Sequence, residues 1–125
     1  MEPVGLSGTA FTIPGLRLVN ETNAREHWAV RSNRAKEQRD TARLSVHGST
    51  HIPAGRKYEI HICRVGPRKL DSDNLAASAK HVRDGIADAL GVNDGDESRA
   101  IWHYAQAPGK HGVYITIYWT PEEKK

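Results

Sequence analysis

The amino-acid sequence predicts an α+β fold, a small mixed β-sheet of about four strands with two main helices packed on it. Residues 58–65 and 113–119 alternate their side chains with the period of two that β-strands have. Residues 73–90 place apolar side chains three and four apart, which is typical of an amphipathic helix. Residues 20–46 contain no proline or glycine and many helix-forming residues, so they predict a second helix.

The length of 125 residues predicts one domain over residues 1–125, with flexible ends at residues 1–10 and 121–125. A single cysteine, Cys63, excludes an internal disulfide. No apolar run is long enough for a membrane span, and no signal-peptide pattern opens the chain. We therefore expect a cytoplasmic protein without membrane contact. The formal net charge of +3 is mildly basic and only suggests nucleic acid as a partner.

The N-terminal third predicts an edge strand and then a basic helix. Residues 11–13 alternate, and Pro14 bends or ends that strand. The helix expected over residues 20–46 carries an apolar stripe of Ala24, Trp28, Ala35 and Ala42. Its basic side chains are Arg25, Arg31, Arg34, Lys36, Arg39 and Arg43. Such a helix is either a solvated face, balanced in part by its own acidic residues, or a surface that contacts phosphates.

Residues 58–65 predict a central strand with Tyr58, Ile60, Ile62 and Arg64 on one face. The strand leads into Arg68 and Lys69, which stand directly before an aspartate-rich segment.

Near the C-terminus, residues 100–106 and 113–119 predict two strands joined as a hairpin with a long turn. The histidines give no metal signal of their own. His47 and His51 lie in polar surroundings without a Cys-x-x-Cys pair, so a zinc site is not expected there.

The helix predicted over residues 73–90 has two different faces. Its apolar stripe is formed by Leu75, Ala79, Val82, Ile86, Ala89 and Leu90. Asp73, Lys80 and Asp84 fall together on the opposite side, at about 100° per residue. Gly91 ends the helix, and a glycine-containing turn then presents Asp94 and Asp96.

Two explanations account for this concentration of carboxylates. Mg²⁺ prefers hard oxygen ligands and is held by one or two carboxylates plus waters and substrate phosphate, so the segment suits a divalent-metal site. The alternative is local chemistry, with Asp73 as a helix N-cap and Asn93-Asp94-Gly95 as a turn. A calcium loop of the EF-hand type is not expected, because neither DSDNLA nor DGDESR has glycine at its sixth position.

The order DSDNL, a helix with Lys80 and Asp84-Gly85, and GVNDGDES resembles the RusA-type Holliday junction resolvases and their phage-borne relatives. In that family an Asp-x-Asp-Asn-Leu motif opens a helix that carries a lysine, and an acidic loop follows. The preceding strand and basic loop, YEIHICRVGPRKL, also fit. The resemblance covers residues 58–119 well and the N-terminal third more loosely.

The resemblance implies roles for individual residues. Asp71 and Asp73 match the paired aspartates of the motif, with Asn74 and Leu75 following. Lys80 matches the catalytic lysine but stands a few residues farther from the motif than in the founding members. Counting from Gly91 favours Asp96 as the third catalytic aspartate, and the position also permits Asp94, because Gly95 separates a pair that is adjacent in those members. The implied catalytic residues are Asp71, Asp73, Lys80 and Asp96, and the implied metal ligands are Asp71, Asp73, Asp94 and Asp96.

The function implied by the resemblance is a Mg²⁺-dependent endonuclease that resolves four-way DNA junctions by paired nicks in recombination and repair, with Mn²⁺ as a substitute metal and no small-molecule cofactor. A homodimer is implied as well, since two-fold symmetry suits two symmetric cuts. The expected DNA-contacting residues are Arg25, Arg31, Arg34, Arg39, Arg68 and Lys69. Two alternatives stay open: a catalytically inactive DNA-binding relative, and a metal-dependent nuclease acting on RNA or another branched substrate.

Overall fold

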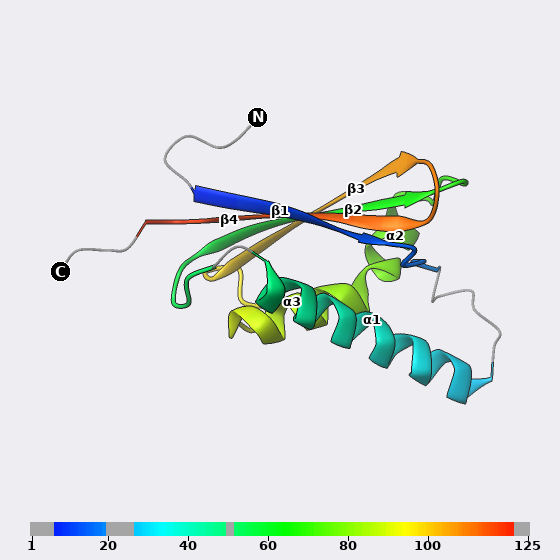
Figure 1. Ribbon diagram of the computed structural model, residues 1–125, viewed down its shortest axis with the longest axis horizontal. Helices are drawn as coiled ribbons and strands as arrows, with labels where there is room; N and C mark the ends of the chain where they lie inside the picture. The colour runs from blue at the N-terminus through cyan, green and yellow to red at the C-terminus, as the bar shows by residue number, and fades with distance from the viewer. Residues whose placement is uncertain (1–6, 20–26, 50–51, 122–125) are drawn as a thin grey trace.

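The computed structural model describes residues 7–19, 27–49 and 52–121. Along the chain it forms the following elements: β1 (Ser7–Pro14), α1 (Trp28–Gly48), β2 (Tyr58–Gly66), α2 (Ser72–Ser78), α3 (Lys80–Leu90), β3 (Ala100–Pro108) and β4 (Gly112–Trp119). The helices α1 and α3 lie together on one face of the sheet, and α2 lies toward one end of it (Figure 1). The predicted α+β fold is confirmed.

The sheet is mixed and has the strand order β1-β4-β2-β3. β2 pairs in parallel with β3, from Tyr58 opposite Ala100 to Gly66 opposite Pro108. β4 runs antiparallel to β2 on one side and to β1 on the other. The predicted central position of β2 is therefore confirmed, and β1 is an edge strand that ends at Pro14 as expected.

The predicted hairpin of the last two strands is wrong, because β2 lies between β3 and β4. After β2, the helices α2 and α3 return the chain to the end of the sheet where β2 begins, so β3 enters parallel to β2. The turn after β3 then passes the end of β2, where the Gly109 N–H donates to the Gly66 carbonyl at 3.1 Å. β4 consequently pairs with the other side of β2.

The core lies between the sheet and the α1–α3 layer. Its fully buried side chains include Ile60 and Ile62 of β2, Ile115 and Ile117 of β4, and Val82 and Ile86 of α3. The two helices approach very closely at Gly85, where an added Cβ would collide with the Arg39 carbonyl and would meet the Ala42 Cβ at 3.0 Å. The buried face of β2 and the apolar face of α3 thus pack into one core.

The predicted helix over residues 73–90 is divided in two at Ala79. The Ser78 hydroxyl donates to the Leu75 carbonyl at 2.7 Å, and the Ala79 N–H bonds the Ala76 carbonyl three residues back. For one turn, these bonds to carbonyls three residues back interrupt the regular α-helical hydrogen bonds to carbonyls four residues back. The predicted buried stripe is nevertheless confirmed at Leu75, Ala79, Val82, Ile86 and Leu90. Gly91 ends α3 in the left-handed conformation, at φ +71.

The basic helix differs from its prediction. α1 begins at Trp28, whose side chain is 73% exposed, so the predicted apolar stripe is wrong at that residue and right at Ala42. The N-terminal end of α1 lies away from the sheet (Figure 1), which leaves Trp28 without a core to enter. Nearer the sheet, buried Gln38 donates its amide Nε2 to the Arg17 carbonyl at 3.0 Å. Ala24 lies outside the described residues.

Ser7–Ala10 belong to β1, so the expectation of a flexible end is wrong for these four residues. Residues 1–6 and 122–125 lie outside the described part of the chain. Among the described residues no helix combines the length and the apolar character that a membrane crossing requires.

Candidate functional site

The candidate site is built on the loop that follows β2, and a buried arginine holds this loop in place. Arg64, only 5% exposed, donates Nη1 to the Arg68 carbonyl at 2.7 Å and Nε to the Leu18 carbonyl at 3.4 Å. Burial, and then the nearby Arg17, lower the pKa of Arg64 from its ordinary value. A guanidinium offers five donors in a fixed fork, so one side chain can tie two backbone segments together.

Gly66 makes room for that arginine. An added Cβ at Gly66 would stand 2.9 Å from Nη2 of Arg64 and 3.1 Å from its Cζ. A side chain at this position would therefore displace the Arg64 guanidinium that holds the loop.

A second anchor comes from β3. The Gln106 side chain accepts from the Leu70 N–H at 2.9 Å and donates to the Leu70 carbonyl at 2.7 Å. Both backbone groups of Leu70 are thus satisfied by one amide, as they would be by a neighbouring strand. Arg68 and Leu70 are consequently fixed to the sheet from two sides.

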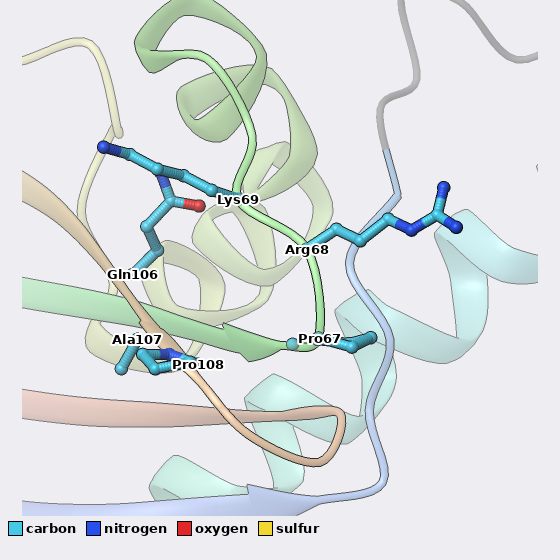
Figure 2. A pocket seen from close by; sticks show the side chains of 7 residues that line it. Pro67, Arg68, Lys69, Gln106, Ala107 and Pro108 are labelled. Carbon is cyan, nitrogen blue, oxygen red and sulfur yellow. The ribbon is translucent and has the colours of Figure 1, made fainter.

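The loop borders a cavity of about 390 Å³ at the carboxyl ends of the two parallel strands. Its lining residues are Gly66, Pro67, Arg68, Lys69, Gln106, Ala107 and Pro108. Figure 2 shows that the side chains of Arg68 and Lys69 point in opposite directions, with Lys69 on the same side as Gln106. The loop beside the cavity thus presents one positive charge on each of two sides.

Asp71 and Asp73 follow at once and are both exposed. Asp71 occupies the N-cap position of α2 but makes no side-chain capping bond, and Asp73 lies in the first turn. The alternative explanation of Asp73 as the N-cap is therefore wrong. Within residues 7–19, 27–49 and 52–121, neither carboxylate forms an ion pair. Two carboxylates without an ion-pair partner among the described residues thus follow directly on the basic residues Arg68 and Lys69.

Lys80 is the first residue of α3, with a side chain that is 70% exposed. Its Nζ lies 4.0 Å from Asp84 Oδ2, at the outer limit of an ion pair, so these two residues share a face as predicted. In the described part of the chain no contact joins Lys80 to Asp73. The break at Ala79 separates the helices that carry them.

Asp94 is engaged with a cation. Its Oδ2 lies 3.2 Å from Arg83 Nε, and its carbonyl accepts from Arg83 Nη2 at 2.6 Å and from Trp102 Nε1 at 3.1 Å. Nε of Arg83 does not point at an acceptor, so the 3.2 Å contact is an ion pair rather than a directed hydrogen bond. Arg83 also lies over the Trp102 ring and donates to the Tyr104 hydroxyl at 2.7 Å.

Asp96 forms a local turn. Its Oδ1 accepts from the Ser98 N–H at 3.0 Å and from the Ser98 hydroxyl at 2.6 Å, and these bonds lower the pKa of Asp96. Its carbonyl accepts from Ala100 at the start of β3, whereas Leu70 is held by Gln106 near the end of β3. Six strand residues at about 3.3 Å each put roughly 20 Å along β3 between the two places. The backbone of Asp96 is therefore anchored at the opposite end of β3 from the loop that leads into Asp71.

The arginines of α1 have unequal surroundings. Arg39 Nε lies 2.7 Å from Asp88 Oδ2 on α3, and that hydrogen bond raises the pKa of Arg39. Arg31 is exposed and Arg34 is half-buried. Arg25, expected to contact DNA, lies outside the described residues.

A cluster that sequence reasoning missed lies on the sheet face away from α1 and α3. It consists of Glu59 and His61 of β2 and His103 of β3, whose ligand-type atoms all lie within 4.8 Å of one another. Burial of the ring, and then the nearby His103, lower the pKa of His61. The alternation of β2 already put Glu59 and His61 on one face, but only the pairing of β2 with β3 brings His103 beside them. His47 is exposed at the end of α1, and His51 lies outside the described residues.

Comparison with known proteins gives little further information. No protein-family model matches this chain. An uncharacterized protein of Xylella fastidiosa is 36% identical over 91 residues, a match that takes in 68% of this chain and 60% of the relative. The chain thus spans less than two thirds of that relative's length.

Proposed function

We propose that this protein is a Mg²⁺-dependent, structure-selective DNA endonuclease that nicks four-way junctions, in the cytoplasm of a bacterial host. The observation that carries the proposal is the loop after β2. There the exposed carboxylates of Asp71 and Asp73 have no ion-pair partner among the described residues and follow directly on Arg68 and Lys69. The resemblance of DSDNL and its flanking segments to RusA-type resolvases supports the same proposal.

Asp71 and Asp73 are the residues that would hold the metal. Their oxygen donors fit Mg²⁺ or Mn²⁺, and two carboxylates are enough, because Mg²⁺ usually keeps several waters and a substrate phosphate as its other ligands. The bound ion would lower the pKa of a coordinated water and stabilise negative charge on the phosphate under attack. Asp96 is left out of this ligand pair, because its backbone is anchored at the start of β3 whereas Leu70 is anchored near the end of that strand.

The residues around the pair would position the DNA backbone. Arg68 and Lys69 project to opposite sides of the loop (Figure 2), so they would contact phosphates on either side of the metal. Lys80, largely exposed, would supply a further cation near the reacting phosphate. Arg31 and Arg34 of α1 would extend the positive surface to a neighbouring arm of the junction.

A homodimer completes the proposal. A four-way junction is resolved by two symmetric nicks, and two copies related by a two-fold axis would present two identical loops to it. Such a dimer would also give one small domain a preference for branched DNA over a linear duplex.

The test is cleavage of labelled synthetic DNA by the purified protein. A four-way junction and a linear duplex of the same sequences are incubated with Mg²⁺, with Mn²⁺ and with EDTA. We expect paired nicks in the junction only, and only with metal. Junction binding without cleavage under every metal condition would contradict the enzyme and favour a DNA-binding relative. Equal cleavage of an RNA or a flap would contradict the proposed substrate.

A further inference from the structure

The open face of the sheet carries a compact group of metal-ligand side chains far from the loop after β2. Glu59 and His61 are two residues apart on β2, so both side chains point to the face opposite the helices. His103 stands directly across from His61 in the parallel β2–β3 pair, so it points to the same face. Three ligand-type residues therefore stand on two neighbouring strands of a sheet.

The distances within the group are close to those of a coordination site. Glu59 Oε1 lies 2.8 Å from His103 Nε2 and 3.6 Å from His61 Nε2. In a tetrahedral zinc site with bonds of 2.0–2.2 Å, neighbouring ligand atoms lie about 3.4 Å apart. The three ligand atoms all lie within 4.8 Å of one another. Side-chain movements of about 1 Å would bring them to the separations that a bound ion requires.

The two imidazoles start from a stacked arrangement, and each ring would turn about its side-chain torsions to point its Nε2 lone pair at a shared ion. The rings of His61 and His103 stack at 4.4 Å with planes 14° apart, and Tyr118 of β4 packs edge-on against His61 at 5.7 Å. The strand backbones fix the Cα positions of all three ligands. Binding would therefore order few groups that the fold does not already order, which lowers its entropic cost.

We propose that Glu59, His61 and His103 form a binding site for a transition-metal ion, with Zn²⁺ as the ion that the ligand set fits best. Two imidazoles and one carboxylate form a ligand set that is common in zinc sites with an open fourth position. Imidazole selects zinc, copper and nickel, whereas Mg²⁺ takes oxygen ligands. The site is thus chemically distinct from the carboxylate pair of Asp71 and Asp73, and it does not depend on the proposed nuclease.

The open position of this ion would face solvent, because the side chains of both histidines are 44% exposed and that of Glu59 is 31% exposed. Water or an external donor group would complete the coordination. Within the protein, the ion would join β2 to β3 across the sheet. Ion binding would therefore stabilise the folded chain and oppose separation of these strands.

The proposal is tested by calorimetric titration of the full chain, free of any affinity tag and stripped with EDTA, with Zn²⁺ alone. We expect one ion per chain, unaffected by excess Mg²⁺. Zinc at about 100 times its Kd should raise the melting temperature by roughly 5–10 °C. A wild-type chain that takes up no stoichiometric zinc, or releases it to Mg²⁺, would overturn the assignment.

Variants locate the ion. His61→Gln and His103→Gln should each weaken zinc binding more than about 10-fold. Loss of a residue that only hydrogen-bonds a metal ligand already costs about that much affinity, and a direct ligand should cost at least as much. His47→Gln, an exposed histidine on α1, serves as the matched control and should bind like the wild type. Asp73→Asn should also bind zinc normally, which separates this site from the loop after β2.

Glu59→Gln keeps the size of the side chain and removes its charge, so it carries the test should a histidine variant fail to fold. Circular dichroism establishes folding of each variant before titration. Unchanged zinc affinity in folded His103→Gln and Glu59→Gln would show that the cluster is a hydrogen-bonded histidine–carboxylate group and not a metal site.

Discussion

The side chain of Gln106 pairs with the backbone of Leu70 through two hydrogen bonds, one accepted at 2.9 Å and one donated at 2.7 Å. Through this pairing β3 holds a loop that lies 36 residues away in sequence. The two aspartates of the candidate site follow that loop directly, so their position depends on a side chain outside the motif.

Gln106→Ala should therefore both destabilise the protein and impair cleavage. The substitution leaves two backbone groups of Leu70 without partners, which costs about 1–3 kcal/mol per unsatisfied buried group, reduced here by partial exposure. Urea unfolding measures the stability, and single-turnover cleavage of a junction measures the activity. Gln106→Glu keeps the acceptor but sets a carboxylate oxygen against the Leu70 carbonyl, so it should not restore the wild-type stability or activity. Full activity in both variants would show that this clamp does not position the site.

Asp73→Asn should abolish cleavage while junction binding survives. The amide keeps the size of the side chain but removes an anionic metal ligand, and loss of one charge-stabilising group typically costs about 100-fold or more. Glu37→Gln on α1 is the control for removal of an exposed carboxylate. Near-normal cleavage by purified Asp73→Asn would exclude the metal from this loop.

The same assay compares Asp96 with the loop pair of Asp71 and Asp73. Asn at position 96 can still accept from Ser98, so Asp96→Asn changes the charge and keeps the turn. Because Asp96 lies at the other end of β3, we expect Asp96→Asn to lose less activity than Asp73→Asn. An equal loss would require Asp96 of a second copy of the chain to complete the site.

Arg31→Ala should weaken binding to all junction sequences alike, since a phosphate contact carries no base information. Each lost contact should flatten the plot of log affinity against log salt by about 0.9 on duplex-like DNA. An unchanged slope in Arg31→Ala and Arg34→Ala would remove α1 from the DNA-binding surface.

Gly85→Ala should destabilise the fold by about 1–3 kcal/mol, because a methyl group there meets the Arg39 carbonyl and forces α1 and α3 apart. Gly48→Ala is the matched control, since no heavy atom lies within 4 Å of an added Cβ at the end of α1. That variant should lose no stability, because the methyl group has free space and alanine has the better helix propensity. Urea unfolding of both variants measures the contrast, and equal stabilities would contradict the close helix contact.

His61 should titrate below the ordinary histidine value of 6.5, because burial and the neighbouring His103 lower its pKa. The unfolded chain then takes up this proton at a higher pH than the folded chain. The stabilising contribution is thus fully present above pH 6.5 and is lost as the pH falls through the lowered pKa of the folded chain. NMR titration of the metal-free protein measures the pKa, and His103→Gln should move it upward. A wild-type pKa above 6.5 would contradict this direction and show that Glu59, which raises the pKa of His61, outweighs burial and His103.

Local structure follows from the sequence alone. Alternation in residues 58–65 fixed which face of β2 is buried, since side chains in a strand point alternately to opposite faces. Spacings of three and four predicted the buried stripe from Leu75 to Leu90. The order of residues also placed Arg68, Lys69, Asp71 and Asp73 together, because residues this near in the chain stay near in any fold.

The meeting of distant segments depends on the tertiary structure. Strand periodicity is the same for parallel and antiparallel neighbours, so it could not show that β3 pairs with β2 instead of β4. That pairing brings His103 to His61 and Gln106 to Leu70, and it leaves Asp96 at the other end of the sheet. The exposure of Trp28 also depends on the tertiary structure, because an apolar stripe on a helix is buried only where another layer covers it.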